Sequence, residues 1–280
     1  MMKRRFVGGV TAIGFTAAVF GGVLAPAPGR SQDAVTSRFD PRDFRAPVGS
    51  NGWQPLTPGL QLVTRGFVNV GDRRLPHIRV YTVTDVTKKI DGVRAVVVLD
   101  QDIDGGQISE QALDFVAVDR KGNVWNVGSY TESYEGGQFV NALDGWLGGV
   151  RGASPGILVP AHPTVGTPPY YEGKVPGREA PIAQVFKTDQ STCVPFRCFK
   201  RVVVIQDGDE HKYFAPGVGG IRTEPLGSGG PQESENLINV RQLRPGALAA
   251  ITAETLKLDK HARSTVADVF SRSAPAEQKR

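Results

Sequence analysis

The chain has 280 residues, of which 40% are hydrophobic and 22% are charged, and its formal net charge is +5. A chain of this length can bury a sizeable core, in one large domain or in two small ones. Much of the positive charge lies near the N-terminus, and no basic block with interleaved aromatic residues follows it, which argues against nucleic acid as a partner.

Residues 1–34 are predicted to be a removable signal peptide. Three basic residues at positions 3–5 precede an apolar run over residues 6–24, and a Pro-rich segment of small residues follows; this is the layout of such a peptide. Ala25 and Ala34 are the two candidate cleavage sites. The alternative is a permanent membrane helix, but the glycines and the threonine in the run make it a weak anchor. We therefore expect an exported protein, periplasmic or extracellular, with no permanent membrane anchor after processing.

The irregular lead-in over residues 35–54 is expected to precede a β-domain over residues 55–244. Alternating or β-branched runs separated by short Gly/Asn turns are typical of hairpins, and two such turns lie at residues 119–123 and 207–209. The sequence thus predicts a mainly β fold, a single antiparallel meandering sheet that is half-barrel or barrel-like. The predicted strands cover residues 60–68, 78–86, 93–99, 113–118, 124–127, 202–206, 212–214, 221–224 and 237–240.

Residues 141–181 are rich in glycine and proline, which do not suit central strands or helices. We expect a long, ordered Pro/Gly-rich loop laid over the barrel or sheet, since Trp146, Tyr170 and Tyr171 are available to pack it. Long loops in compact domains are either functional or disordered.

Residues 245–280 are predicted to form a C-terminal amphipathic helix and tail. Pro245 suits the start of a helix, and apolar residues from Leu248 to Val269 recur at three- and four-residue spacing. The charges along this segment are mixed in sign, which favours a helix packed on the β-domain over one that lies on a membrane surface.

Cys193 and Cys198 are the only cysteines, and two close cysteines usually pair in an oxidising compartment. Pro195 and Phe196 between them favour a tight turn between two extended runs. A redox or metal-binding pair is the alternative, but the spacing is not that of thiol oxidoreductases and no other cysteine completes a zinc set. We predict a structural disulfide.

Three stretches of the chain stand out by their order and spacing. They are residues 119–125 (DRKGNVW), residues 145–157, which begin with GW and end with GASPGI, and residues 213–219 (YFAPGVG). Together they resemble a family of exported bacterial β-rich proteins that has no assigned activity.

The resemblance spans residues 55–224 and implies one antiparallel, meandering β-domain and a secreted location. This chain departs from the family at residues 128–129, which read Gly-Ser where relatives tend to carry an acidic residue. It also departs at residues 193–198, where a cysteine-bounded loop replaces a plain Gly turn. The first difference weakens any carry-over of a carboxylate site.

Asp100, Asp102 and Asp104 precede Gly105 in a D-x-D-x-D-G pattern, which is the opening of a calcium-binding loop. The closing carboxylate is out of place, because Glu110 lies one position early. In a strand, the three aspartates share one face, where they repel one another. Two interpretations stay open: a solvated hairpin tip, and a calcium site to which Glu110 contributes. Calcium is the one cofactor that the sequence suggests.

The four histidines are scattered and form no H-E-x-x-H pattern. Glu210 and His211 could meet Asp114 or Asp119 in three dimensions, which the sequence does not show. No catalytic residue is therefore assigned.

Three classes of function follow. The first is a binding module for an apolar or amphiphilic small molecule, with Trp125, Trp146, Tyr170 and Tyr171 as the ligand-binding residues. The second is a secreted structural protein that interacts with a cell-envelope component. The third is a hydrolase or lyase that uses a carboxylate–histidine set. We favour binding over catalysis; an enclosed apolar cavity would support the first class, and clustered carboxylates and histidine in a polar cleft would support the third.

Overall fold

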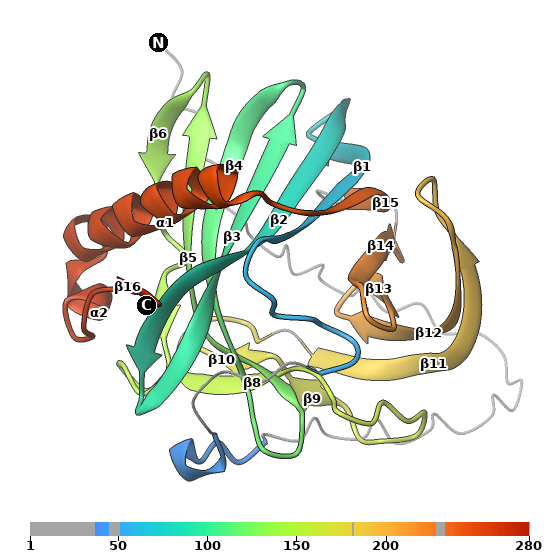
Figure 1. Cartoon of the computed structure of the whole chain (residues 1–280), viewed down its shortest axis with the longest axis horizontal. Helices are drawn as coiled ribbons and strands as arrows, with labels where there is room; N and C mark the ends of the chain where they lie inside the picture. Colours follow the sequence, from blue (N-terminus) through green and yellow to red (C-terminus); the bar gives the residue numbers. More distant parts are fainter. Residues whose placement is uncertain (1–36, 45–50, 181, 228–232, 280) are drawn as a thin grey trace, which may run out of the picture. The chain divides into compact units, whose positions relative to one another are not determined.

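A computed structural model describes residues 37–44, 51–180, 182–227 and 233–279, so the predicted signal peptide lies outside the described residues. Most of the described chain forms one antiparallel sheet (Figure 1), which confirms the predicted fold class. The strands are β1 (Leu60–Val70), β2 (Arg73–Ile90), β3 (Val93–Asp104), β4 (Gln107–Val118), β5 (Val124–Glu135), β6 (Gln138–Asn141), β7 (Trp146–Leu147), β8 (Ser154–Val159), β9 (Tyr170–Tyr171), β10 (Gly173–Lys174), β11 (Ile182–Cys193), β12 (Cys198–Asp207), β13 (Glu210–Ala215), β14 (Gly219–Pro225), β15 (Glu233–Gln242) and β16 (Glu277–Gln278).

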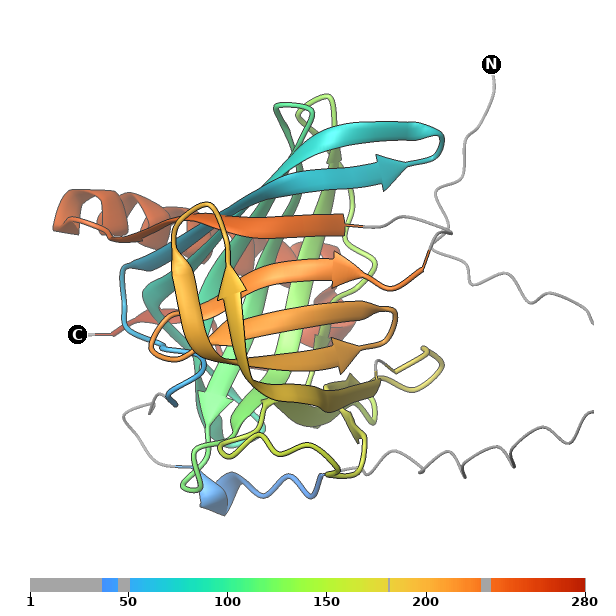
Figure 2. The same cartoon turned by 90° about the vertical axis from the view of Figure 1, so that its right-hand side faces the viewer.

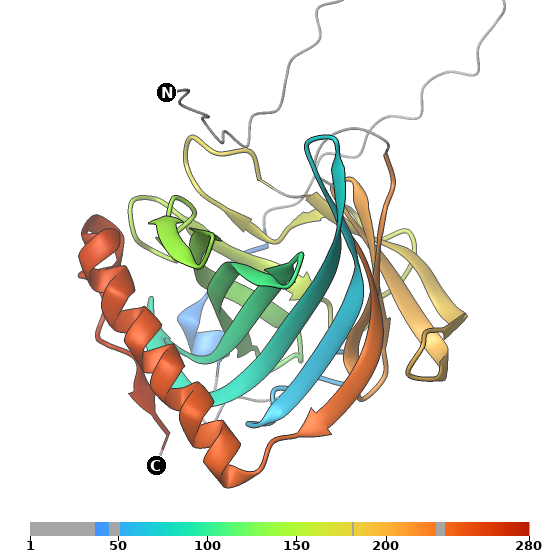
Figure 3. The same ribbon diagram turned by 90° about the horizontal axis from the view of Figure 1, so that it is seen from above.

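The strand order explains how the sheet curves into a barrel. Hydrogen-bonded neighbours run β10-β8-β5-β4-β3-β2-β1-β15-β14-β13-β12-β11-β9. Two runs of consecutive hairpins, β1 to β5 and β11 to β15, are joined where β1 pairs with β15. The strands of the two runs cross at a steep angle (Figure 2), and the view from above shows them surrounding an interior (Figure 3).

The Pro/Gly-rich region closes this barrel, a role that we did not expect for it. Residues 170–174, here called the seam, pair with β11 through β9 and with β8 through β10. A Cβ atom on Gly156 of β8 would lie 2.2 Å from the carbonyl oxygen of Tyr171, so glycine permits this close approach. The predicted loop therefore contains short strands. Pro155 is tolerated near the start of β8 because the β5–β8 pairing ends at Gly156.

The outer face of β2–β5 is covered by helices, as predicted for the C-terminus. Helix α1 (Pro245–Thr265) begins at the expected proline, and α2 (Ala267–Phe270) follows it. Leu258, Ala262 and Phe270 are buried against outward-facing side chains of β3 and β4, such as Phe115. None of the helices in the described residues is long and apolar enough to cross a membrane.

The barrel interior is apolar at one end and polar further along. A buried cluster that includes Val83, Val98, Val116 and Ile205 fills the apolar end. Part of the lead-in packs there too, because Trp53 contacts the same cluster. The polar part of the interior holds the candidate site.

The two cysteines lie where β11 and β12 meet. The sulfur atoms of Cys193 and Cys198 are 1.94 Å apart, a disulfide distance, and the two residues pair across the hairpin. The loop between them packs back on the barrel, since the Phe196 N–H donates to the Leu237 carbonyl at 3.0 Å. The predicted disulfide is thus present.

Candidate functional site

A cavity of about 290 Å³ lies inside the barrel, near the lower end of the range typical of small-molecule sites. Its walls come from β1, β2, β4, β5, β8, β13, β14 and β15, together with Gln54 of the lead-in and Glu172 of the seam. One part of the lining is apolar, with Leu60, Leu62 and Phe214. The rest carries ionisable side chains.

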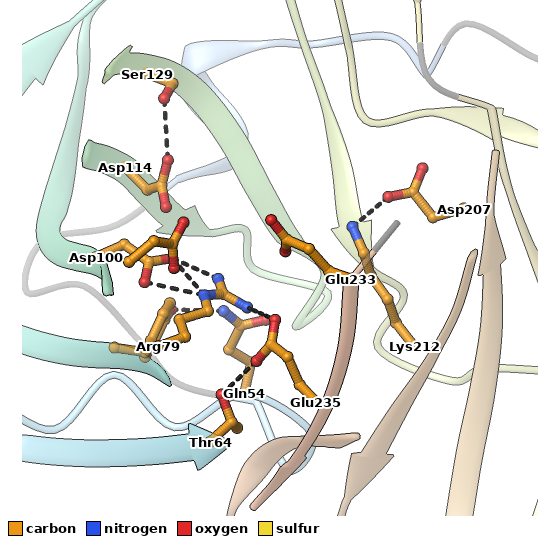
Figure 4. A network of polar contacts seen from close by, with 12 residues as sticks. Gln54, Thr64, Arg79, Asp100, Asp114, Ser129, Asp207, Lys212, Glu233 and Glu235 are labelled. Atoms are coloured by element: carbon orange, nitrogen blue, oxygen red, sulfur yellow. Dashed lines mark hydrogen bonds and ion pairs between the residues drawn. The ribbon is translucent and has the colours of Figure 1, made fainter. Parts of the chain in front are cut away.

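Arg79 of β2 organises the polar part of the interior (Figure 4). Its Nε donates to both carboxylate oxygens of Asp100, at 2.9 and 2.8 Å. Its Nη1 lies 3.9 Å from Oε1 of Glu235, whose other oxygen accepts a hydrogen bond from Thr64. Arg79 thus stands between a carboxylate of the neighbouring strand β3 and a carboxylate of β15, which lies beyond β1 on the other side.

A second ionic group lies at the seam. Lys212 of β13 pairs with Asp207 of β12, and Glu172 completes the group. Burial raises the pKa of Glu172 to about 8, with Asp207 adding to the effect and Lys212 opposing it. Burial would lower the pKa of Lys212, but Glu172 and Asp207 outweigh it and raise that pKa.

Asp114 of β4 is the third acidic group that faces the cavity. Ser129 donates a hydrogen bond to it at 3.0 Å. Burial raises the pKa of Asp114 to about 6, and the charge of Asp100 adds to this shift. The cavity therefore holds two carboxyl groups, Asp114 and Glu172, that titrate near neutral pH.

The lining carries more negative charge than positive charge. Each of its cations already contacts a carboxylate that does not line the cavity: Arg79 with Asp100, Lys212 with Asp207, and Arg222 with Glu224. The three lining carboxylates, Asp114, Glu172 and Glu235, come in addition to these pairs. When all are ionised, the interior has an excess of negative charge.

The structure brings the predicted calcium residues to one face, as period-two spacing required. Asp102 faces Glu110 directly across the β3–β4 ladder. Asp100, however, is held by Arg79, and Asp104 accepts a hydrogen bond from Nδ1 of His77 at 2.7 Å. The aspartates are only 11–21% exposed, so they are not a solvated hairpin tip. The Arg79 guanidinium and the His77 N–H, both from β2, relieve part of their repulsion, and calcium binding at this set stays a prediction.

The predicted aromatic residues lie elsewhere. Trp125 is buried on the outer face, where its indole N–H donates to Asp119 at 2.9 Å. Trp146 lies against Gly173 of the seam. Tyr170 is buried in the apolar end of the interior, and Tyr171 stacks with Lys174. None of the four lines the cavity among the described residues, and a ligand contact for them stays a prediction.

The suggested carboxylate–histidine set does not come together in the cavity. His211 stacks on Phe186 at 4.3 Å, on the face of β13 opposite Lys212. Asp119 caps the β4–β5 turn by accepting hydrogen bonds from the N–H groups of Lys121 and Asn123. Of the suggested residues, Asp114 lines the cavity.

Sequence reasoning missed the residues that matter most in the interior. His77 and Arg79 of β2 face the interior and alternate with outward-facing residues. This period-two pattern is present in the sequence, but by itself it indicates a strand and not a site. Glu172 lies in a Pro/Gly-rich stretch, where no such period marks it.

The arrangement can hold a cation, and it can exchange protons near neutral pH through Asp114 and Glu172. The chain matches no family model, no curated protein and no solved structure, so its proposed function rests on the chemistry of this interior.

Proposed function

We propose that this protein binds a small amphiphilic molecule that carries a protonated amine or a similar cationic group. The observation that supports the proposal is the composition of the cavity wall, which combines an apolar part with carboxylates that, together with the partners of Arg79, Lys212 and Arg222, outnumber the local cations. A cationic group beside Asp114 and Glu172 would offset the negative charge, and an alkyl chain would cover Leu60, Leu62 and Phe214.

Binding is expected to strengthen as the pH rises from about 6 to about 8.5. Asp114, with a pKa of about 6, and Glu172, with a pKa of about 8, lose their protons over this interval, while an alkylamine keeps its charge. Deprotonation therefore adds negative charge to the wall that faces the ligand. Calorimetry with octylamine, octanol and octanoate, in the presence of a chelator, measures the preference and its pH dependence.

Asp114→Asn is expected to weaken octylamine binding by about tenfold and to leave octanol binding nearly unchanged. Glu179→Gln is the matched control, because Glu179 is exposed and far from the lining. Equal binding of all three probes, or tighter binding of octanoate, would contradict the proposal.

Proton transfer is a second candidate function, supported by the separated pKa values of Asp114 and Glu172 in one cavity. Two carboxyl groups whose environments push their pKa values apart are a common acid–base arrangement. A hydrolase of this kind would cleave p-nitrophenyl octanoate with a rate maximum between pH 6 and 8. Failure of Asp114→Asn to remove the acidic limb would rule out this role for Asp114.

We also propose that the protein acts outside the cytoplasm, since the N-terminal pattern predicts export and the disulfide suits an oxidising compartment. The exported protein is expected to begin between residues 25 and 35, which N-terminal sequencing determines. An intact Met1 on a protein extracted from membranes would contradict this. A purely structural role in the cell envelope is the less favoured alternative. Buried carboxylates lower the stability of the fold, and a purely structural role gives no reason to keep them.

A further inference from the structure

We infer that His77, Glu233 and Glu235 form a binding site for a divalent transition-metal ion, and that Zn²⁺ is the ion that this donor set favours. The inference does not depend on the proposed binding of an amphiphilic cation. It rests on an imidazole nitrogen that has no hydrogen-bond partner among the described residues, on the carboxylates around this nitrogen, and on the way in which the fold orients these groups.

The orphaned atom is Nε2 of His77. The imidazole is fully buried, with 0% of the side chain exposed, and Nε2 has no hydrogen-bond partner among the described residues. It lies 3.9 Å from Oε1 of Glu235 and 4.0 Å from Oε2 of Glu233. These distances are too long for hydrogen bonds. They are close to the spacing of ligand atoms around an ion that is bound at about 2.0–2.2 Å.

The three donor atoms converge on one point. One ligand atom from each of His77, Glu233 and Glu235 lies within 4.8 Å of the others. Glu233 is the most exposed of the three, at 39% of its side chain, and its carboxylate points into the interior (Figure 4). A small rotation of this side chain therefore suffices to tighten the set.

Nδ1 of His77 is held in the way that metal-binding histidines require. It donates to Oδ1 of Asp104 at 2.7 Å, which fixes the tautomer that leaves the Nε2 lone pair free for a metal. A carboxylate behind a ligating imidazole is the usual outer partner in such sites. Asp104 is thus a positioning residue.

The backbone of β1 leaves room between the donors. Gly66 pairs with His77 on one side and with Glu235 on the other, so it stands between them in the same row of the sheet. A Cβ atom at this position would lie 1.6 Å from the carbonyl oxygen of Ser234. Only glycine fits there, and no side chain separates His77 from Glu235.

The donor types indicate the class of ion. Imidazole nitrogen suits zinc and other first-row transition ions, whereas calcium and magnesium prefer all-oxygen sites. Asp102 offers a further oxygen atom, because its buried Oδ1 lies 3.8 Å from Nε2 of His77 and has no partner in the described chain. Arg79 donates its Nε and Nη2 to Asp100, and its Nη1 lies 3.9 Å from Oε1 of Glu235. A dication would meet the carboxylates of Glu233 and Glu235, of which only Glu235 lies within 4 Å of Arg79.

The test is metal binding by the processed full-length protein without a purification tag. After treatment with chelator, we expect calorimetry to show one Zn²⁺ per chain, weaker binding of Mn²⁺, and a melting temperature that rises with the concentration of Zn²⁺ by mass action. Glu233→Gln is expected to remove the stoichiometric binding, and its partly exposed side chain makes it the variant least harmful to folding. Asp104→Asn is expected to weaken binding about 10–100-fold.

Two controls separate this site from other sites. His162→Gln, at an exposed histidine, and Glu110→Gln, opposite Asp102, are both expected to bind Zn²⁺ as the unmodified protein does. No stoichiometric binding of Zn²⁺, or binding that survives both His77→Gln and Glu233→Gln, would overturn the inference. Calcium binding that Glu110→Gln abolishes, without zinc binding, would also overturn it and would favour the aspartates of β3 instead.

Discussion

Replacing Lys88 by methionine is expected to destabilise the protein by about 3–5 kcal/mol at neutral pH. Lys88 of β2 is fully buried beneath α1, where its Nζ donates to Oδ1 of Asp259 at 2.7 Å and to the Ala274 carbonyl at 2.9 Å. The rings of Phe115 and Phe270 lie about 6 Å from Nζ. Without the lysine, Asp259 would keep a charge in an apolar setting, and this uncompensated charge accounts for the large cost.

The double variant Lys88→Met/Asp259→Leu is expected to recover most of that loss, since a buried ion pair can be replaced by apolar residues at little cost. Urea unfolding of the two single variants and the double variant gives the coupling energy of the pair. The exposed pair of Lys257 and Glu254, 3.4 Å apart on the same helix, is the matched control. Lys257→Met should change stability by less than about 0.5 kcal/mol. Additive effects of the Lys88 and Asp259 substitutions would contradict this account.

Replacing Arg79 by methionine is expected to cost about 3 kcal/mol at pH 7, at the lower end of the range for such pairs because 35% of its side chain is exposed. Asp100 and Glu235 would then lose the cation that they share. Protonation of these carboxylates at lower pH would remove the uncompensated negative charge. The added instability should therefore shrink as the pH falls from 7 towards about 4.

The stability of the unmodified protein should depend on pH with the same sign. Burial raises the pKa of Asp102 to about 9 and that of Glu110 to about 7, so the free energy of unfolding should decrease as the pH rises from about 4 to 9. Urea melts across this range, with chelator present, measure both slopes. Arg94→Met, which breaks an exposed pair with Glu277, should leave the slope unchanged. An Arg79→Met penalty that stays constant with pH would refute the role given to Arg79.

Local patterns predicted the elements well because those elements depend on neighbours in the chain. The turn at residues 119–123 forms the β4–β5 hairpin, and the turn at 207–209 forms the β12–β13 hairpin. Pro245 begins α1 as expected. In each case the periodicity and the turn residues lie within a few positions of one another, and tertiary packing agrees with them.

The partners in the interior could not be predicted, because a bulge resets the register of β2 against β3. Near the turn, Ile90 pairs with Val93, but beyond a bulge between Val83 and Thr87 the pairing shifts, and Arg79 lies opposite Asp102. Extending the first register would place Arg79 opposite Asp104 instead. A shift of this kind decides which carboxylate meets which cation, and the sequence carries no clear mark of it.

Pairing between strands that are far apart in the sequence also limits what the sequence can predict about the site. Glu233 and Glu235 reach His77 only because β15 joins β1, from the opposite end of the β-domain. No local pattern states which strands close a barrel. The glutamates of β15 therefore gave no signal of a site in the sequence, and they lie outside residues 237–240, the part of their strand that was predicted.

The number of paired residues between neighbouring strands differs around the barrel, and it is small at the seam. Long ladders join most of the hairpin strands, whereas β9 and β10 contribute two residue pairs each, as does the β14–β15 pairing. The seam is therefore one of the places where little free energy is needed to separate the sheet locally. Separation at this place would leave every hairpin intact and would carry Glu172 away from Lys212. Such a separation would give a ligand a path into the interior through the wall of the barrel. The same separation would weaken the electrostatic interactions with a ligand that is already bound.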